Sequence, residues 1–356
     1  MKITFPYWGN YTIAFKALFK ALGVDFIAPE KTSSASIEEG AKLSPSMYCF
    51  PLKVNMGNYL SAIRKGADTI FMVTSLSGSC RLRYYAAVED KSLLEAGHNI
   101  KFVIFNQSLK DVYLKIKNLS HASNGRILLA ALIFFKKLRL VEKLEKRAQY
   151  IRPREKVKGS VDEILKTGLE KLDEADGLRE IAKVEKEIDK KISQIGIDRN
   201  KKVPQVGFIG EIFTVTDNMI NFEIEKKLGQ EGIEIHRVMD VTYHLKKILF
   251  PWKDYIIQQK IRPYLKSTVG GHGRDAIYEM LDYMERDFDG IVHLLPFGCM
   301  PETTVRPILE KIRQKTRMPF LSISLDEQVA EAGIGTRIEA FVDVVKNYYS
   351  KKPGQS

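Results

Sequence analysis

Residues 290–325 read GIVHLLPFGCMPETTVRPILEKIRQKTRMPFLSISL, and this stretch decides the fold. Gly290 to Leu295 is a short apolar run typical of a strand, Glu302 to Thr316 has helical spacing, and Phe320 to Leu325 is a second strand. Two strands joined by a helix pair in parallel within one sheet, and the helix covers a face of that sheet. The stretch therefore predicts an α/β protein.

The same alternation occupies both ends of the chain. In the first hundred residues we expect four strands with helices between them: Ile3 to Tyr7, Val24 to Ala28, Thr69 to Val73 and Ile100 to Phe105. Beyond residue 200, strands are expected at Gln205 to Ile209 and Ile233 to Val238, with a helix from Asn218 to Leu228 between them.

The middle of the chain, from about Ser108 to Ile195, shows no strand pattern. Its second half carries apolar residues at spacings of three and four, which form one helix face: Ile181, Val184, Ile188, Ile192 and Ile195. We therefore predict two flavodoxin- or Rossmann-like parallel-sheet domains, residues 1–107 and 201–350. A helical segment at 108–200 lies between them, and a flexible tail covers 351–356.

Composition narrows the class of protein. Hydrophobic residues make up 44% of the 356 residues, enough for real cores. No secretory signal opens the chain, and the longest apolar run, Ile127 to Phe135, is far shorter than the roughly 20 residues of a spanning helix. We expect a cytoplasmic protein that does not enter a membrane.

A basic run lies within the helical segment. Lys136 to Lys158 holds ten Lys or Arg residues against three Glu, within a net charge of +12. Such a run can bind nucleic acid, anionic lipid or a phosphorylated ligand, but no aromatic platform or nucleic-acid motif accompanies it. We favour a solvated helix face, so nucleic acid is an unlikely partner.

The three cysteines fall in loops. Cys80 and Cys299 each follow a predicted strand, at the sheet edge where open α/β folds bind ligands. Cys49 precedes a helix, where the positive end of the helix dipole favours a thiolate. Gly78 and Gly298 stand beside two of these cysteines and would let backbone N–H groups turn toward a bound anion or cluster.

An odd number of cysteines argues against a disulfide framework and suits a reducing compartment. The chain has no Cys-x-x-Cys pair and no histidine pair at ligand spacing, which disfavours zinc. Two interpretations stay open. In the first, the three thiols coordinate one shared metal centre in a cleft that the fold forms. In the second, each cysteine is a small buried hydrophobic residue.

Several short motifs occur in a characteristic order. They are Cys49-Phe50-Pro51-Leu52-Lys53, Gly207-Phe208-Ile209-Gly210-Glu211, Gly270-Gly271-His272-Gly273, Cys299-Met300-Pro301-Glu302, Pro319 to Glu327, Glu331-Ala332-Gly333 and Thr336 to Phe341. The series resembles the acyl-CoA dehydratase activase-related proteins, near the 2-hydroxyacyl-CoA dehydratase and benzoyl-CoA reductase iron–sulfur subunits. The resemblance covers nearly the whole chain and is weakest across the helical segment.

The resemblance implies an iron–sulfur cluster whose three cysteine ligands map onto Cys49, Cys80 and Cys299. In the wider family the cluster is a [4Fe-4S] cubane with one open iron, or a double-cubane. It implies electrons from an ATP-dependent activase, a small or CoA-linked substrate, and a second family subunit or a homodimer as partner. This chain has no Gly-x-x-x-x-Gly-Lys-Ser/Thr loop, so another subunit would bind the ATP.

Four further side chains are candidates. Glu211, His272 and Glu302 are candidate catalytic groups, and Lys53 could balance an anionic cluster or hold a CoA phosphate. Each has a plainer interpretation: a helix or loop contact for Glu211, a hydrogen-bonded loop residue for His272, helix N-terminus stabilisation for Glu302 and surface charge for Lys53. The function is therefore an iron–sulfur reductase or dehydratase component, a cluster-bearing electron-transfer or scaffold subunit, or a cluster-free binding module.

Overall fold

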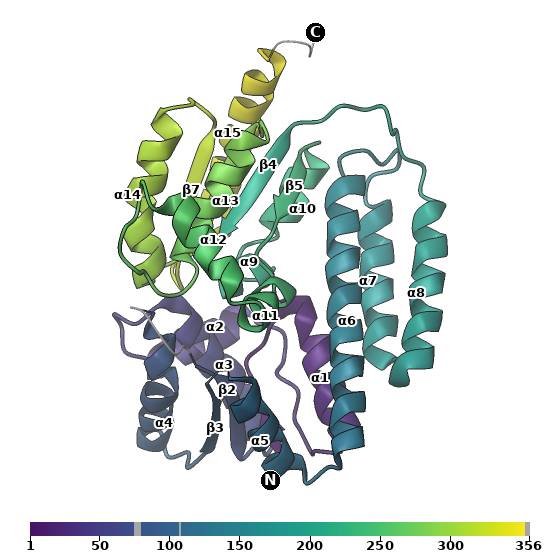
Figure 1. The fold of residues 1–356 in the computed structure, drawn as a ribbon, viewed down its shortest axis with the longest axis vertical. Coiled ribbons are helices and arrows are strands. Elements are labelled where there is room, and N and C mark those ends of the chain that lie inside the picture. The colour runs from purple at the N-terminus through teal and green to yellow at the C-terminus, as the bar shows by residue number, and fades with distance from the viewer. Residues whose placement is uncertain (75–79, 107, 353–356) are drawn as a thin grey trace.

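The computed structural model describes residues 1–74, 80–106 and 108–352, so most of the predicted tail lies outside the described residues. Figure 1 shows two sheets, one above the other, with a group of long helices along one side of both. Every strand pairing in both sheets is parallel. The predicted α/β class is confirmed.

The N-terminal sheet has the order β1-β2-β3, from Ile3–Thr4, Thr69–Val73 and Lys101–Phe105. Its helices are α1 (Thr12–Leu22), α2 (Ser34–Leu43), α3 (Phe50–Arg64) and α4 (Tyr85–Glu95), with 3-10 turns η1 (Gly9–Tyr11) and η2 (Arg81–Tyr84).

The predicted strand from Val24 to Ala28 is wrong, because only Phe26 forms a bridge, to Ile3. Its partner β1 is two residues long, and Pro29 offers no N–H to continue the ladder.

The C-terminal sheet has the order β5-β4-β6-β7, from Glu234–Arg237, Gln205–Gly210, Gly290–Pro296 and Phe320–Leu325. If the bridge at Phe26 is counted as a strand, each sheet has four strands. Numbered along the chain, their order across each sheet is 2-1-3-4. This is the flavodoxin-like order, whose ligand crevice lies between the first and third strands. In the C-terminal sheet these are β4 and β6.

Around the C-terminal sheet lie α9 (Ile212–Thr216), α10 (Ile224–Gln230), α13 (Gly273–Glu285), α14 (Met300–Gln314) and α15 (Glu331–Ser350). The helix expected from Asn218 begins only at Ile224, because Phe222 and Glu223 adopt positive φ angles that a helix cannot contain. The sequence analysis did not identify α11 (Val241–Leu249) and α12 (Trp252–Ile261).

The segment between the sheets is helical: α5 (Leu109–Ser120), α6 (Asn124–Ile151), α7 (Ser160–Glu174) and α8 (Gly177–Ser193). Ile181 and Ile188 of the predicted apolar stripe are fully buried. Aromatic contacts join the segment to the first domain, since the rings of Phe15 on α1 and Phe134 on α6 meet edge to face at 5.2 Å. One hydrophobic core thus runs from the N-terminal sheet through α6 to the C-terminal sheet.

Most of the basic run is paired within the protein rather than solvated. Lys136 and Lys143 contact Glu185, Arg147 contacts Asp189, Arg152 contacts Asp162 and Arg154 contacts Glu234. These pairs hold α6 and its C-terminal extension to α8, α7 and β5, so the run has an internal structural use.

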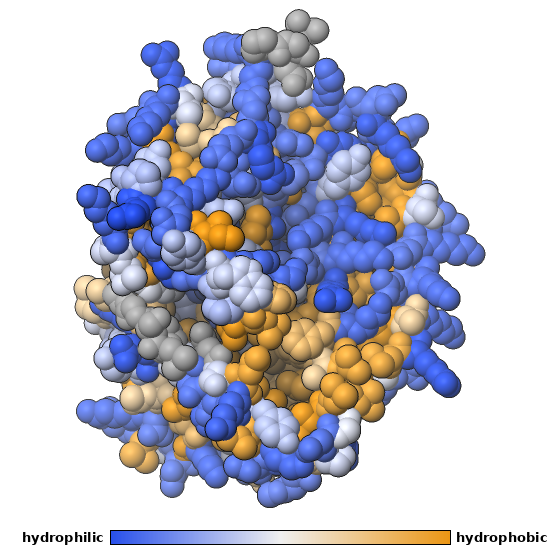
Figure 2. All heavy atoms as spheres, in the orientation of Figure 1, coloured by the Kyte–Doolittle hydropathy of each residue, from blue (hydrophilic) through white to orange (hydrophobic). Residues whose placement is uncertain are grey.

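The surface of α6 changes along its length. Its N-terminal half exposes four large apolar side chains, Leu128, Leu129, Leu132 and Phe135. Figure 2 shows apolar side chains gathered on the lower part of this face and charged ones over α7 and α8. Among the residues described, no helix is both long enough and apolar enough to cross a bilayer.

Candidate functional site

The three cysteines occupy the same local position, each immediately before a helix. Cys49 precedes α3, Cys80 precedes η2 and Cys299 precedes α14, all with extended backbone angles. None of their side chains caps its helix by a hydrogen bond. Both α3 and α14 begin Cys-x-Pro, with a proline in the first turn where its missing N–H costs nothing.

The loops of Cys49 and Cys299 pack against each other, although 250 residues separate the two cysteines. Phe50 donates its N–H to the carbonyl of Phe297 at 3.0 Å. Gly298 has φ +74°, and a Cβ there would lie 3.1 Å from the Cα of Cys49. Only glycine fits this close approach without strain, which gives the predicted residue Gly298 a defined structural role.

Cys80 lies against a second glycine turn. A Cβ on Gly271, which has φ +59°, would stand 3.6 Å from the Cys80 Sγ and 3.1 Å from the Cγ of Pro301. The cysteine loops therefore meet where the two sheet domains face each other, here called the seam (residues 48–51, 80–81, 270–272 and 297–302). Gly78 lies outside the described residues.

Burial dominates the chemistry of the thiols. Burial raises the pKa of Cys49 to about 12, although a hydrogen bond between its Sγ and the Tyr85 hydroxyl, at 2.8 Å, opposes the shift. Burial also raises the pKa of Cys80, and burial together with Glu302 and Glu211 raises that of Cys299 well above its usual value. The expectation that a helix N-terminus would favour the thiolate of Cys49 is therefore wrong for the metal-free protein, because desolvation outweighs the dipole.

No three His, Cys, Asp or Glu side chains among the described residues stand close enough to hold a single metal ion. The seam nevertheless offers three thiols, and its Arg81 opposes the rise in the pKa of Cys49 only in part. Thiols of this kind ionise when a metal takes the place of their protons. The donor set thus suits iron with sulfide rather than a lone hard cation.

Glu211 follows β4, at the strand next to the one that Cys299 follows. Its Oε2 accepts from the N–H of Thr214 at 3.1 Å and from the Thr214 hydroxyl at 2.9 Å, so it caps α9. Burial raises its pKa to about 7. The plainer interpretation of Glu211, a helix or loop contact, is thus observed as a helix contact, and the same carboxyl can exchange a proton near neutral pH.

Glu302 is completely buried in the first turn of α14. Its Oε2 lies 2.9 Å from Nε2 of His293, whose Nδ1 lies 3.1 Å from the hydroxyl of Ser322. Within the described part of the chain, Oε1 of Glu302 has no hydrogen-bond partner. The sequence analysis missed His293, since a single histidine inside an apolar strand carries no distinguishing pattern.

His272 is the residue that precedes α13, and it follows Gly271, whose turn lies against Cys80. Its Nε2 lies 3.3 Å from Nδ1 of His244 on α11. Burial lowers the pKa of both imidazoles, so both rings are neutral at neutral pH. His244 could not be identified from sequence, because its helix carried no prediction.

Lys53 is buried on α3 and forms an ion pair with Glu327, in the loop after β7. The pair joins the two sheet domains directly. Thr32 and Asp217 add a second buried link, a hydrogen bond of 2.6 Å. These contacts fix the distance between the halves that carry the cysteines.

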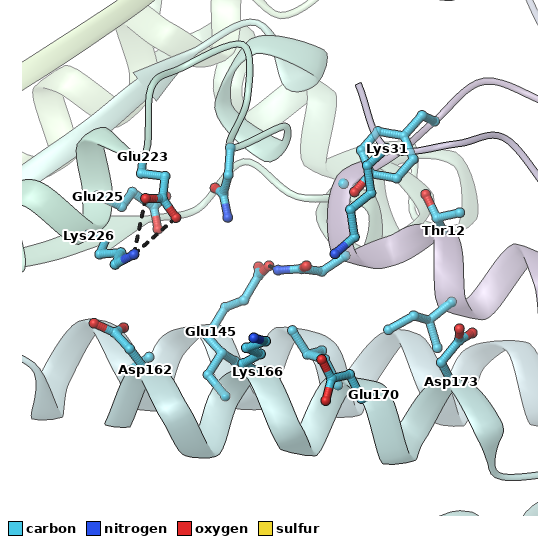
Figure 3. Close-up of a pocket in the computed structure, with 18 of the residues that line it drawn as sticks. Thr12, Lys31, Glu145, Asp162, Lys166, Glu170, Asp173, Glu223, Glu225 and Lys226 are labelled. Carbon is cyan, nitrogen blue, oxygen red and sulfur yellow. Dashed lines mark hydrogen bonds and ion pairs between the residues drawn. The ribbon is translucent and has the colours of Figure 1, made fainter. Parts of the chain in front are cut away.

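A cavity of about 630 Å³ lies elsewhere, between α1, α7 and the turn before α10 (Figure 3). No cysteine and none of the predicted site residues lines it. Its charged side chains are mostly paired, as Lys226 with Glu223 and Arg152 with Asp162. The predicted site residues that the structure describes therefore lie away from this cavity.

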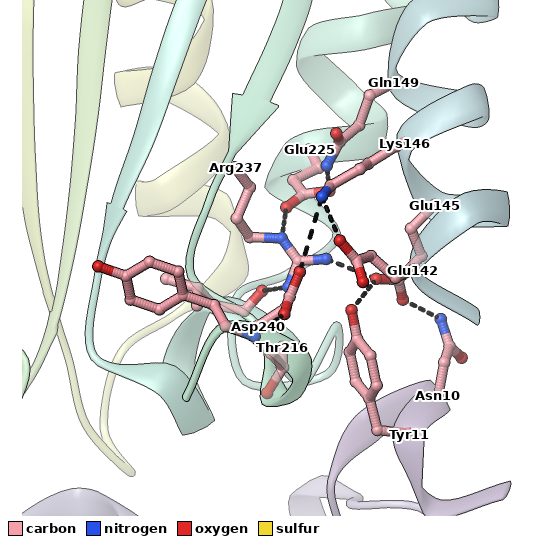
Figure 4. A network of polar contacts seen from close by, with 12 residues as sticks. Asn10, Tyr11, Glu142, Glu145, Lys146, Gln149, Thr216, Glu225, Arg237 and Asp240 are labelled. Atoms are coloured by element: carbon pink, nitrogen blue, oxygen red, sulfur yellow. Dashed lines mark hydrogen bonds and ion pairs between the residues drawn. The ribbon is translucent and has the colours of Figure 1, made fainter. Parts of the chain in front are cut away.

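The wall of that cavity includes a network that ties the three parts of the chain together (Figure 4). Arg237 on β5 lies 2.6 Å from Glu145 on α6 and 2.7 Å from Glu225 on α10. Asn10 and Tyr11 donate to the same Glu145 from the first domain. We call these five residues the junction network.

A family model described as CoA enzyme activase uncharacterised domain (DUF2229) matches residues 4–78, about a fifth of the chain. The matched part contains Cys49 and Lys53. This match supports the expected relationship to activase-related proteins for the N-terminal sheet. No curated protein gives a significant match to the chain.

Proposed function

We propose that this protein is an iron–sulfur component of an acyl-CoA dehydratase or related reductase system, with its cluster held by Cys49, Cys80 and Cys299. The observation that carries the proposal is the meeting of three helix-preceding cysteine loops in the seam. Loops from both sheet domains supply the ligands, at the edge where α/β folds bind them. The matched activase-type domain supports the same system.

The cluster would be a [4Fe-4S] cubane or a double-cubane, and it would supply low-potential electrons to a small or CoA-linked substrate. Those electrons would come from an ATP-dependent activase, since this chain carries no phosphate loop of the Walker type. A second family subunit or a second copy of this chain completes the proposed assembly. The reducing cytoplasm suits three free thiols.

The protein's own groups prepare the seam for this role. The Tyr85 hydroxyl orients the Sγ of Cys49, and Gly298 and Gly271 allow two backbone turns to approach the thiols closely. Burial keeps water away from Cys49 and Cys299. Glu211, with a pKa near 7, can give or take a proton beside them.

The experiment is purification without oxygen, followed by iron and sulfide analysis and a visible spectrum. Equal iron and sulfide with a broad charge-transfer band is expected for the native protein, and each of Cys49→Ser, Cys80→Ser and Cys299→Ser should lose most of the iron. His98→Ala, outside the seam, is the matched control and should keep it. Colourless native protein after anaerobic reconstitution would reject the proposal and leave the cluster-free binding module.

An electron-transfer subunit without a substrate is the second candidate, and Lys53 favours it. Lys53 forms an ion pair with Glu327, so its ammonium group is not available to a CoA phosphate. Turnover of acyl-CoA by the reduced, cluster-loaded protein would decide for the enzyme. Reduction without turnover would decide for the electron-transfer subunit.

A further inference from the structure

Two histidines meet at the edge of the seam with their ring nitrogens facing each other. Nε2 of His272 lies 3.3 Å from Nδ1 of His244, the ring centroids are 5.4 Å apart and the planes cross at 78°. His272 is held at the start of α13, and His244 projects from α11. His244 lies within α11, whereas His272 is the last residue of the turn before α13.

The charged groups around the two rings are paired with one another. Lys247, one turn after His244, is bound to Asp275 at 2.8 Å and Asp254 at 3.1 Å. The Tyr243 hydroxyl donates to the same Asp275 at 2.9 Å. Asp275, the acid that acts on His244, is therefore already bound to Lys247 and Tyr243, and among the described residues neither ring has another hydrogen bond.

Two neutral imidazoles in this arrangement must have exactly one proton between the facing nitrogens. Two lone pairs, or two N–H groups, would repel each other at 3.3 Å. If Nε2 of His272 accepts, both rings carry their proton on Nδ1. If it donates, both carry it on Nε2. The two rings are thus required to adopt the same tautomer.

We propose that His244 is a positioning residue that fixes the tautomer and ring orientation of His272, so that the pair conducts a proton to the seam. A proton taken up at Nε2 of His244 drives transfer of the Nδ1 proton of His244 to Nε2 of His272. The Nδ1 proton of His272 then leaves from the 270–272 turn of the seam. One proton enters, one leaves, and no charge remains on the pair.

The test uses the full chain in its iron-free form with ¹⁵N-labelled histidine, so it stays informative if the cluster proposal fails. Nitrogen chemical shifts distinguish the two tautomers for each of the six histidines. We expect His244 and His272 to show one shared tautomer, with a preference of roughly fivefold or more, the ratio that one net hydrogen bond sets.

Variants sharpen the result. His244→Phe should abolish the preference at His272, and His244→Asn, whose amide reaches the position of Nδ1, should restore it. His98→Phe should leave both shifts unchanged, and an unchanged melting temperature would show that the fold is intact. Opposite tautomers in the native protein, or shifts of His272 that His244→Phe does not move, would overturn the proposal.

Discussion

The seam and the junction network are both buried meeting points of distant segments, but they treat charge in opposite ways. In the junction network, Arg237 faces Glu145 and Glu225, so each buried charge has an opposite partner. In and behind the seam, burial instead raises the pKa of thiols and carboxyls, and Arg81 opposes the shift at Cys49 only in part. The junction network thus pairs its buried charges within the protein, whereas the seam leaves its buried thiols neutral. We propose that a bound cluster would change this.

The largest expected effect is a loss of stability when the junction network is broken. Arg237→Met leaves Glu145 and Glu225 buried without their cation, so the free energy of unfolding should fall by about 3–5 kcal/mol. Urea denaturation measures it. Lys226→Ala, which removes an exposed ion pair to Glu223 at the same cavity, should change stability by less than about 0.5 kcal/mol. Equal losses in both variants would contradict the contrast.

The second effect concerns Glu89, on the helix α4 that also carries Tyr85. Burial raises the pKa of Glu89 to about 8, and a hydrogen bond with the Asn55 side chain opposes that shift only in part. The folded protein keeps this proton up to about pH 8, whereas the unfolded chain loses it near 4.5. The free energy of unfolding should therefore be unaffected by Glu89 below pH 4.5, and it should fall as the pH rises toward 8.

Glu89→Gln removes that titration. The variant should gain roughly 3 kcal/mol over the native protein at pH 7, as an upper value, and gain nothing at pH 4. Thermal unfolding at the two pH values measures the difference. Glu95→Gln, at the exposed end of the same helix, is the control and should give parallel curves. A pH-independent gain would show that the shape of Glu89, not its charge, is responsible.

The third effect separates the seam contact from backbone strain. Gly298→Ala introduces both a positive-φ alanine and a Cβ 3.1 Å from the Cα of Cys49. Gly97→Ala has a similar φ of +86° and open space around it. Both should lose about 1 kcal/mol from the backbone, and Gly298→Ala roughly 1–2 kcal/mol more, together with bound iron. Identical losses would argue that the two cysteine loops do not touch in solution.

The smallest effect is at Tyr85. Tyr85→Phe removes the hydroxyl that stabilises the thiolate of Cys49, so the pKa of that thiol should rise further and alkylation of the iron-free protein at pH 9 should slow. Stability should fall by only about 1 kcal/mol. Peptide mapping reports each cysteine separately. Tyr84→Phe, an exposed neighbour, should alkylate like the native protein.

The sequence predicts some features of these sites and not others, for a physical reason. Strand periodicity is local, so it located Cys80 and Cys299 at strand ends and predicted β6 and β7 closely. Contacts such as Gly298 with Cys49 depend on how two domains dock, and no local pattern encodes that. The repeated Cys-x-Pro at Cys49 and Cys299 was the one readable sign that the two loops are equivalent.

Other misses have equally specific causes. The strand at Val24 to Ala28 shrank to one bridge because its neighbour β1 is too short to pair with it. His244 lies on a helix whose sequence, flanked by Asp240 and Pro251, was never assigned. Arg237 and Glu145 read as ordinary charges in sequence, and only their burial makes them structural.

Cys299 lies 250 positions after Cys49, so the two cysteines are synthesised at different times. At roughly 5–20 residues per second, synthesis reaches Cys299 about 12 to 50 s after Cys49. Until then the Phe297–Gly298 turn is not in place against Cys49, and the packing of the first domain alone covers its thiol. The cover of Cys49 is therefore completed only when the last domain closes.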